Sequence, residues 1–389
     1  MGTPLPVDIP INPVLLAGPG AELAEDSLSI RALIDGQPHR DALGTISVNS
    51  DLTIPGDVDY STGNINFKGN IIVKGMIREG FVVRGINLTA NEIQGAVIDL
   101  SGDLNVSSGI RASKISFHGN MYAKYLNHSI VRGFGNLVIQ REIFGSDILV
   151  SGSCQNQAGH IISSQISAKL GIDAGKIGTP VSKPCKLKVG VDKHIEVVKT
   201  EINGVLEALA EKSQLLKIEI KKLEDQDQEL YRDISEKAHV QDRAQLEIKE
   251  LKKILPDLQK SNDIKKLQET SDLIRNLLEK AKGAEKDLNA IFDIQDKIVN
   301  QIDRLKTEAG LIEEQSKAHI LEKQAMTEFS KKDTPVAVLT IAKSIAVDTV
   351  VKGPHSSLTL KEGRNRCKIQ EISMSENDTQ FYEMIISDL

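Results

Sequence analysis

The chain has 389 residues, enough for two or three domains and for a core that folds without disulfides or metal. Aromatic content is only 3%, Trp is absent and the net charge is −6, which argues against a nucleic-acid-binding chain. We find no basic-then-apolar leader and no window approaching 18 apolar residues, so we expect a cytoplasmic protein without a membrane span. The cysteines form no CxxC pair and are odd in number, so we expect buried or unreactive thiols in a reducing compartment: Cys154, Cys185 and Cys367.

Residues 1–55 are predicted to form an extended lead-in followed by cap strands. Prolines at positions 4, 6, 10 and 13 disfavour helix at the start. Ile30 and Ala32 then alternate with polar residues before the turn at Asp35-Gly36, and Ile46 and Val48 indicate another short strand. We expect this segment to cover the first coil of the domain that follows, because an open sheet end is a sticky edge.

A repeat dominates residues 56–190. Glycines close successive units at spacings of 16, 17, 17, 16, 17 and 19 residues: Gly69, Gly85, Gly102, Gly119, Gly135, Gly152 and Gly171. No single unit can bury its apolar side chains, whereas stacked units share one continuous core. We expect these glycines to lie at corners that need a positive φ or a tight turn.

Apolar residues recur with the same period in three columns. The first column is Ile71, Ile86, Leu104, Met121, Leu137 and Cys154. The second is Ile77, Ile93, Ile110, Leu126, Ile143 and Ile161. The third is Phe81, Ile98, Ile115, Val131, Ile148 and Ile166, with Val83, Leu100, Phe117 and Val150 two residues further on. Spacing by two is strand periodicity. Three short strands per unit predict a three-faced, right-handed parallel β-helix.

Residues 191–333 change to helix periodicity. Ile195, Ile202, Leu209, Leu216, Leu223 and Leu230 are spaced by seven, with Val198 and Val205 in the complementary position. A second arm shows Ile291, Ile298, Leu305 and Ile312 at sevens, with Ile294 three after Ile291. Pro256 and the Ser261-Asn262-Asp263 run are expected to stop the first helix and cap the second. Arms of about 64 and 67 residues, each about 95 Å long, predict an antiparallel coiled-coil hairpin.

Residues 334–389 return to strand patterns and are predicted to rejoin the β-helix. The expected strands are Val336–Ile341, Val347–Val351, Leu358–Leu360 and Cys367–Ile369. Residues 372–389 are polar, and we expect them to be loose apart from the patch between Phe381 and Ile386. The overall class is therefore mainly β with a long α insertion.

Residues 56–65 read Gly-Asp-Val-Asp-Tyr-Ser-Thr-Gly-Asn-Ile, and with the 17-residue repeats they resemble the flagellar assembly protein A family. Lys176-Ile177-Gly178-Thr179-Pro180 and Val189-Gly190-Val191-Asp192 are further matches. The turn that is often proline-glycine after the coiled coil is replaced here by Ala346-Val347-Asp348. Family members commonly carry an extra N-terminal domain, and the printed sequence starts without one. The resemblance implies a part in bacterial flagellum assembly or placement.

Few side chains suggest chemistry. His118 and His128 fall in successive coils and could approach each other, but we expect no metal site and no cofactor. We interpret Asp99, Asp103 and Asp147 as turn formers rather than the acidic cluster of a polysaccharide-cleaving β-helix. A structural ladder is expected from the polar residues that follow closing glycines: Asn70, Asp103, Asn120 and Asn136.

Together these observations predict a non-enzymatic cytoplasmic scaffold or adaptor without catalytic residues. Its expected partners are proteins of the flagellar or cell-pole machinery, and a homo-oligomer is possible. One alternative is a polymer-forming, bactofilin-like cytoskeletal β-helix, and a less favoured one is a carbohydrate-active enzyme. The candidate docking site is the apolar cluster at the hairpin tip, which alternatively serves only to close the hairpin: Ile254, Leu255, Leu258, Ile264 and Leu267.

Overall fold

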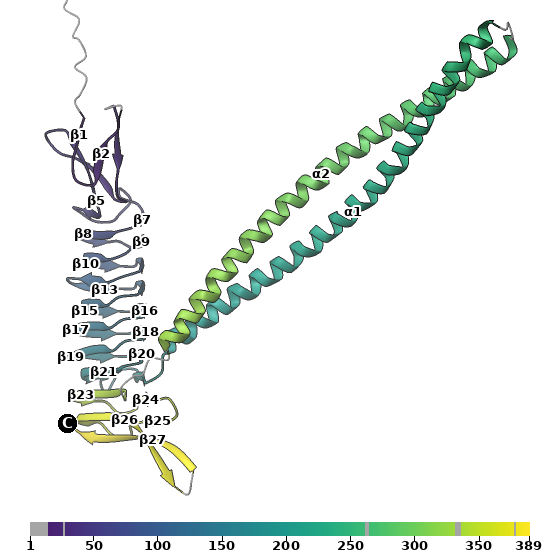
Figure 1. Cartoon of the computed structure of the whole chain (residues 1–389). Helices are drawn as coiled ribbons and strands as arrows, with labels where there is room; N and C mark the ends of the chain where they lie inside the picture. The colour runs from purple at the N-terminus through teal and green to yellow at the C-terminus, as the bar shows by residue number, and fades with distance from the viewer. Residues whose placement is uncertain (1–14, 26–27, 261–263, 331–335, 377–378) are drawn as a thin grey trace, which may run out of the picture. The chain divides into compact units, whose positions relative to one another are not determined.

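The computed structural model describes residues 15–25, 28–260, 264–330, 336–376 and 379–389. The chain divides into two compact units: Met1–Val198 with Phe329–Leu389, called here the solenoid unit, and Lys199–Glu328, called the hairpin unit. Predictions for the prolines before residue 15, for Ser261–Asp263 and for residues 331–335 lie outside the described residues. The fold class is the predicted one, a parallel β-solenoid interrupted by two long helices (Figure 1).

One wall of the solenoid is a twelve-stranded sheet, whose strands stack coil upon coil in parallel until two antiparallel strands close it. In chain order its strands are β6 (Asp51–Ile54), β8 (Asn70–Ile77), β10 (Leu88–Gln94), β12 (Leu104–Val106), β13 (Gly109–Arg111), β15 (Met121–Asn127), β17 (Leu137–Phe144), β19 (Cys154–Ile162), β21 (Gly171–Ile177), β23 (Val338–Ile345), β26 (Arg364–Glu376) and β27 (Thr379–Asp388).

The opposite wall is a ten-stranded sheet of shorter strands, parallel except for its last member. Its strands are β7 (Ile65–Asn66), β9 (Val82–Gly85), β11 (Val97–Leu100), β14 (Lys114–Phe117), β16 (Ile130–Gly133), β18 (Asp147–Val150), β20 (Gln165–Ala168), β22 (Lys186–Val189), β24 (Val350–Lys352) and β25 (Ser357–Thr359).

The three predicted columns are present, but they build two sheets rather than three separate faces. The first two columns lie on one long strand in most coils, and the register shifts between them, as between Ala90 and Glu92. One coil divides this strand in two, at Ser107-Ser108 between β12 and β13, and in the first coil Val58 pairs with Ile77 outside β6. The backbone stays extended through the irregularity, so one bent sheet carries both columns.

Two column members are wrong, both near the start of the repeat. Leu88, not Ile86, pairs with Ile71 and Leu104, and Ile86 is 44% exposed. In this coil Leu88 is the third residue after the closing glycine, whereas in the next coil Leu104 is the second residue after its glycine. Val83, not Phe81, stands opposite Ile98.

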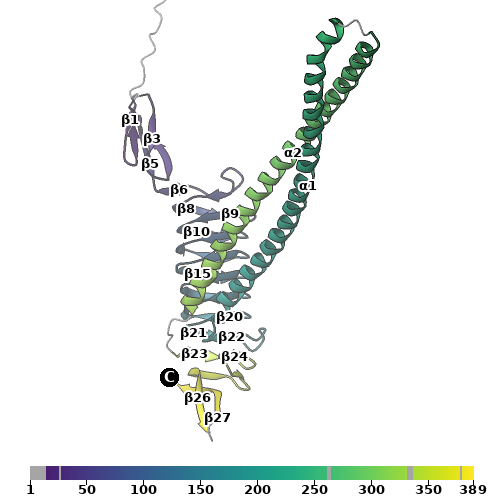
Figure 2. The same cartoon turned by 45° about the vertical axis from the view of Figure 1, so that its right-hand side comes forward.

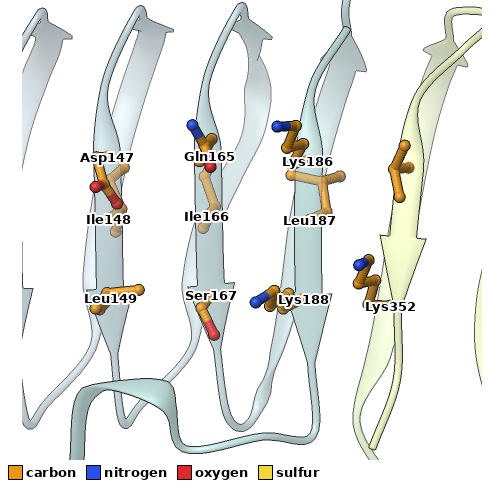
Figure 3. Close-up of a pocket in the computed structure, with 11 residues that line it drawn as sticks. Asp147, Ile148, Leu149, Gln165, Ile166, Ser167, Lys186, Leu187, Lys188 and Lys352 are labelled. Atoms are coloured by element: carbon orange, nitrogen blue, oxygen red, sulfur yellow. The ribbon is translucent and has the colours of Figure 1, made fainter. Parts of the chain in front are cut away.

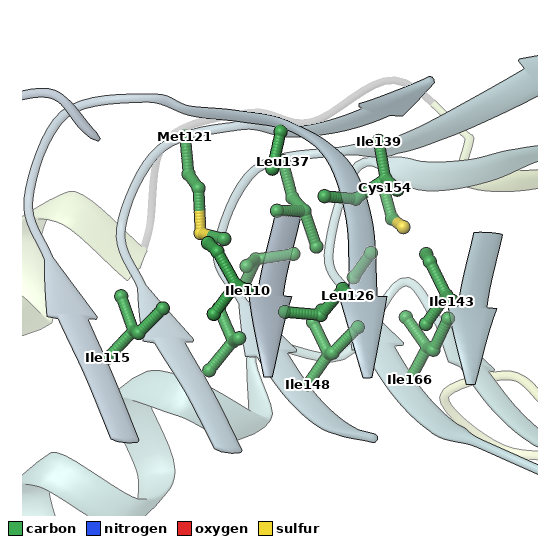
Figure 4. Close-up of a cluster of buried hydrophobic side chains, with 14 of the residues drawn as sticks. Ile110, Ile115, Met121, Leu126, Leu137, Ile139, Ile143, Ile148, Cys154 and Ile166 are labelled. Atoms are coloured by element: carbon green, nitrogen blue, oxygen red, sulfur yellow. The ribbon is translucent and has the colours of Figure 1, made fainter. Parts of the chain in front are cut away.

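The core lies between the two sheets and runs through every coil. Figure 4 shows side chains from the three columns facing one another inside the stack. Ile115, Ile148 and Ile166 come from β14, β18 and β20 of the ten-stranded sheet, and β16 lies between the first two. Ile115 and Ile148 are 0% exposed. Cys154 takes a core position, and burial raises the pKa of its thiol to about 12. Cys185 and Cys367 are buried and free as well, which confirms the prediction of buried, unpaired thiols.

The closing glycines are needed for space rather than for backbone conformation. Of the seven, only Gly171 has a left-handed φ, at 118°, so the first of the two predicted reasons, a positive φ, does not apply to the other six. A Cβ at Gly135 would overlap the carbonyl oxygen of Gly119, and a Cβ at Gly152 would overlap that of Gly135. Consecutive coils approach too closely at this corner for any side chain.

A second corner, between the long and the short sheet, does require a left-handed residue in successive coils. Non-glycine residues adopt this conformation at Ala112, His128 and Ser163, with φ of 50°, 46° and 51°. The amide of His128 donates to the carbonyl of Phe144 in the next coil, so the bend is held by stacking. His118 and His128 contact different rings, Phe134 and Phe144, and do not come together.

Two polar ladders run along the stack. The predicted ladder is confirmed: the amide N–H of Asn120 donates to Asp103 Oδ1 at 2.6 Å, and that of Asn136 donates to Asn120 Oδ1 at 3.0 Å. Asn70, the fourth predicted member, bonds to Asp51 and Asn87, and together with Ser153 these two residues extend the ladder in both directions. The second ladder was not predicted and consists of buried serines whose hydroxyls accept an amide N–H of the preceding coil: Ser113, Ser129, Ser146 and Ser164.

Antiparallel strands stand at both ends of the stack. At the N-terminal end lie a three-stranded sheet of β1 (Leu16–Ala17), β5 (Thr45–Asn49) and β4 (Gln37–Arg40), and a pair of β2 (Ala21–Leu23) with β3 (Ile30–Ala32) (Figure 1). At the other end β26 and β27 pair over ten positions. The prediction of a loose segment after residue 372 is therefore wrong, because alternation around Met384, which is 6% exposed, gives β27 an apolar face.

The insertion consists of α1 (Lys193–Lys260) and α2 (Ile264–Ser330), 68 and 67 residues long. Figure 2 shows the two helices as one long hairpin. Pro256 lies inside α1 and does not end it, contrary to the prediction. The missing amide removes one hydrogen bond, but only four residues of α1 follow it.

We expect that the hairpin can be removed without unfolding the solenoid, because the two units have separate cores. Replacement of residues 200–325 by a short Gly/Ser linker should leave the strand signal in circular dichroism and shift the remaining melting temperature by only a few degrees. Loss of the strand signal on deletion would contradict this modular organisation.

Candidate interaction sites on the hairpin and its base

The inner face of the hairpin, called here the seam, follows the predicted seven-residue period. On α1, Ile202, Leu216 and Leu223 are buried, and on α2, Ile302 and Ile312 are buried. Two of the three complementary positions were misassigned: Val205 is 44% and Ile294 48% exposed, and their places in the seam are taken by Leu206 and Gln295, which are half-buried as Val198 is. In each arm the prediction was displaced by one residue, because an apolar residue, Val205 or Ile294, directly precedes the true seam position.

Contacts across the seam define an antiparallel register. Lys212 pairs with Glu308, Glu224 with Lys306 and Lys237 with Asp287, each at 2.7 Å. As the residue numbers of these pairs increase along α1, those of their partners decrease along α2, as the predicted antiparallel hairpin requires. These pairs are partly exposed and contribute little stability individually, so they set register more than they hold the helices together.

The predicted tip cluster divides into two groups. Leu255, Leu258 and Leu267 are half-buried and continue the seam to the end of the hairpin. Ile254 and Ile264 are 52% and 70% exposed. The first group therefore belongs to the hairpin's own packing, whereas the second presents apolar surface at the tip.

Charge is segregated along the hairpin. The tip segment, residues 249–266, holds six Lys against three Asp and Glu. The rest of the hairpin unit, residues 199–248 and 267–328, holds 17 Lys and Arg against 25 Asp and Glu. A basic end on an acidic shaft favours a partner with acidic groups, and it distinguishes the tip from the shaft electrostatically.

The base of the hairpin belongs to the solenoid unit and is tied to it at both helix ends. Asp192 caps α1, because its Oδ1 accepts the amide of Ile195 at 3.1 Å, and the hydroxyl of Ser151 donates to the same oxygen at 2.8 Å. At the end of α2, Lys169 Nζ donates to the carbonyl of Ser330 at 3.2 Å, which satisfies a terminal acceptor with a favourable charge.

His194, in the first turn of α1, is a buried histidine in this base. It is 4% exposed, and its ring lies 4.4 Å from that of Phe134, centroid to centroid. Burial lowers the pKa of His194 to about 4; the charge of Asp192 opposes this shift, and Arg132 and His118 add to it. The imidazole is therefore neutral at pH 7. Periodicity could not reveal this site, because Phe134 lies 60 residues before His194.

The aspartates considered for catalysis do not gather. Asp99 and Asp147 lie on strands, not in turns as predicted, and pair with Arg84 and Arg132 at 3.7 and 3.1 Å. Asp103 belongs to the polar ladder. Over the described ranges, no group of three or more His, Cys, Asp or Glu side chains could hold a metal ion. No helix within the described part of the chain is long and apolar enough to cross a membrane.

The fold defines a β-solenoid protein with an inserted helical hairpin. The model of the flagellar assembly protein A β-solenoid domain matches residues 50–266, more than half of the chain, and the protein belongs to that family. The match covers β6 to β22, all of α1 and four of the five predicted tip residues, leaving out Leu267. Neither a curated protein nor a solved structure matches the chain significantly.

Proposed function

We propose that the protein is a non-enzymatic cytoplasmic scaffold in flagellum assembly or placement, which recruits a protein partner through the hairpin tip. Family membership associates the chain with flagellar assembly. The observation that carries the proposed mechanism is the pair of exposed isoleucines, Ile254 and Ile264, within a lysine-rich tip segment. Apolar side chains within a lysine-rich segment suit a partner with an apolar pocket bordered by carboxylates.

The length of the hairpin supports a reaching role. Helices of 68 and 67 residues extend about 100 Å at about 1.5 Å per residue. A coiled coil needs only a few heptads to be stable, so stability alone does not account for this length. The acidic shaft keeps the arm solvated and leaves the tip as its distinct binding surface.

The end structures favour a scaffold over the bactofilin-like alternative. Polymerisation of a solenoid requires open ends on which the next copy can stack. Here β26 and β27 turn antiparallel at one end, and the sheets of β1 to β5 stand at the other. The carbohydrate-active alternative finds no support in the positions of Asp99, Asp103 and Asp147, which take separate partners.

The tip is tested by Ile254→Ser combined with Ile264→Ser. Both side chains are exposed, so we expect a change in unfolding free energy of less than about 0.5 kcal/mol. Loss of two interface anchors should weaken partner binding by about tenfold to a hundredfold, seen as altered flagellum number or position in cells.

The matched control is Leu255→Ser combined with Leu258→Ser, which alters the half-buried seam beside the same surface. We expect this variant to loosen the end of the hairpin by about 1–3 kcal/mol. A stable Ile254/Ile264 variant with normal flagella would reject docking through the exposed tip and leave the cluster as a cap of the hairpin.

A further inference from the structure

The outer face of the ten-stranded sheet carries a cavity of about 290 Å³ near its C-terminal end. Strands β18, β20, β22 and β24 form its floor, and all of them belong to the solenoid unit. Figure 3 shows the polar side chains at this cavity on neighbouring strands, with the ammonium groups of Lys186 and Lys188 on the side of β22 that faces β20.

Three lysines at this cavity lack a counter-charge. Lys188 stands directly opposite Lys352 in the parallel register, and Lys186 lies two residues before Lys188, on the same face of β22. No ion pair of these lysines occurs among the described residues. Like charges directly opposite each other destabilise a sheet, so this arrangement is unfavourable unless an anion balances it.

Elsewhere on the same sheet face, two arginines are balanced by aspartates. Arg84 on β9 pairs with Asp99 on β11, and Arg132 on β16 pairs with Asp147 on β18. Asp147 borders the cavity, but its carboxylate is already held by Arg132 at 3.1 Å. The three lysines thus gather positive charge at one place on this face, whereas Arg84 and Arg132 in the preceding coils are each paired with an aspartate.

Neutral hydrogen-bonding groups complete the cavity. Ser167 is 3% exposed, and its hydroxyl has no hydrogen-bond partner in the described structure. The register places Ser167 opposite Lys188 and Gln165 opposite Lys186. In Figure 3 the Lys188 side chain reaches toward Ser167. A buried hydroxyl without a partner is unfavourable, and an anion between Ser167 and Lys188 would accept its hydrogen bond.

We propose that this cavity binds the phosphate group of a small phosphorylated molecule. A phosphate dianion offers oxygens in several directions, which suits point-like ammonium donors and a hydroxyl arranged around it. A carboxylate is planar and is matched better by the forked donors of arginine, which the cavity does not place beside the lysines. The site lies on the solenoid and is independent of the function proposed for the hairpin tip.

The test is calorimetric titration of the full-length protein with inorganic pyrophosphate, at low and at moderate salt. We expect saturable binding that weakens as salt rises. In the Lys186→Gln, Lys188→Gln, Lys352→Gln variant the dissociation constant should rise by at least about tenfold, because three charge-assisted contacts are lost. Ser167→Ala should raise it by about threefold to tenfold without changing the melting temperature by more than a few degrees.

The control variant removes the same charge from exposed lysines elsewhere on the solenoid: Lys68→Gln, Lys74→Gln and Lys114→Gln. This variant should bind pyrophosphate like the wild type. Vesicles containing phosphatidylglycerol form a second arm. Binding of vesicles but not of pyrophosphate, lost in the first variant only, would assign the phosphate to a lipid headgroup and overturn the small-molecule ligand. No binding of either probe, or equal weakening in both triple variants, would overturn the site itself.

Discussion

Replacement of Ile115 by aspartate is expected to destabilise the solenoid unit by about 4–6 kcal/mol. Ile115 is 0% exposed and lies between Ile98 and Val131 in the stacked sheet. The substitution removes apolar contacts on both sides and places a carboxyl group where no described side chain can pair with it. Since whole domains are stable by only about 5–15 kcal/mol, we expect most of the strand signal to be lost at moderate denaturant.

The neighbouring residue supplies the control. Lys114 precedes Ile115 on β14 and points to the outer face, so Lys114→Asp should change the unfolding free energy by less than about 0.5 kcal/mol. Guanidinium unfolding followed by circular dichroism compares the two variants. A midpoint for Ile115→Asp equal to that of the wild type would contradict the assignment of the third column to the core.

The interior of the solenoid could be predicted because its apolar residues recur in the sequence at the spacing of the coils. Ile93, Ile110 and Leu126 recur at a nearly constant interval, and the structure stacks them in register. The errors arose where the interval changes. The insertion before Leu88 shifts the apolar position, and side-chain type alone does not reveal which of two nearby residues points inward.

The serine ladder left a signal that could have been found. Ser113, Ser129 and Ser146 each stand three residues after a member of the second column. A small hydroxyl at that place bonds to its own chain and to the coil before it, as Ser146 does with the carbonyl of Phe144 and the amide of Ser129. The predicted ladder lay beside the closing glycines, at the other corner, and the serines were not predicted.

The lysine cavity could not be predicted from sequence patterns. Lys188 and Lys352 are separated by the whole hairpin, and only the register of β22 with β24 makes them neighbours. The exposure of Ile254 and Ile264 could not be predicted either, because the sequence does not show whether an isoleucine faces the seam or the solvent until the seam positions of the helix are known. In both cases the residue types were visible, while their neighbours depend on pairing across long separations.

The base of the hairpin should lose stability as pH falls, because His194 is buried as a neutral group. The ordinary histidine pKa is 6.5, and burial lowers the pKa of His194 to about 4 in the folded protein. Above pH 6.5 neither state binds the proton. Between pH 6.5 and 4 the unfolded state binds it while the folded state does not, so stability decreases by up to about 3 kcal/mol in this window.

Comparison with His194→Phe isolates this contribution. Phenylalanine keeps an aromatic ring beside Phe134 and cannot titrate. Chemical unfolding at pH 6.5 and pH 5.0 should show the wild type losing about 2 kcal/mol more than the variant, since each pH unit corresponds to about 1.4 kcal/mol per proton. His39→Gln, at an exposed histidine on β4, should keep the wild-type difference. Amide exchange at the first turn of α1 reports whether the loss is local. Equal pH dependence of the wild type and His194→Phe would show that the imidazole is not held neutral, and a drop only below pH 4 would assign the transition to the carboxylates.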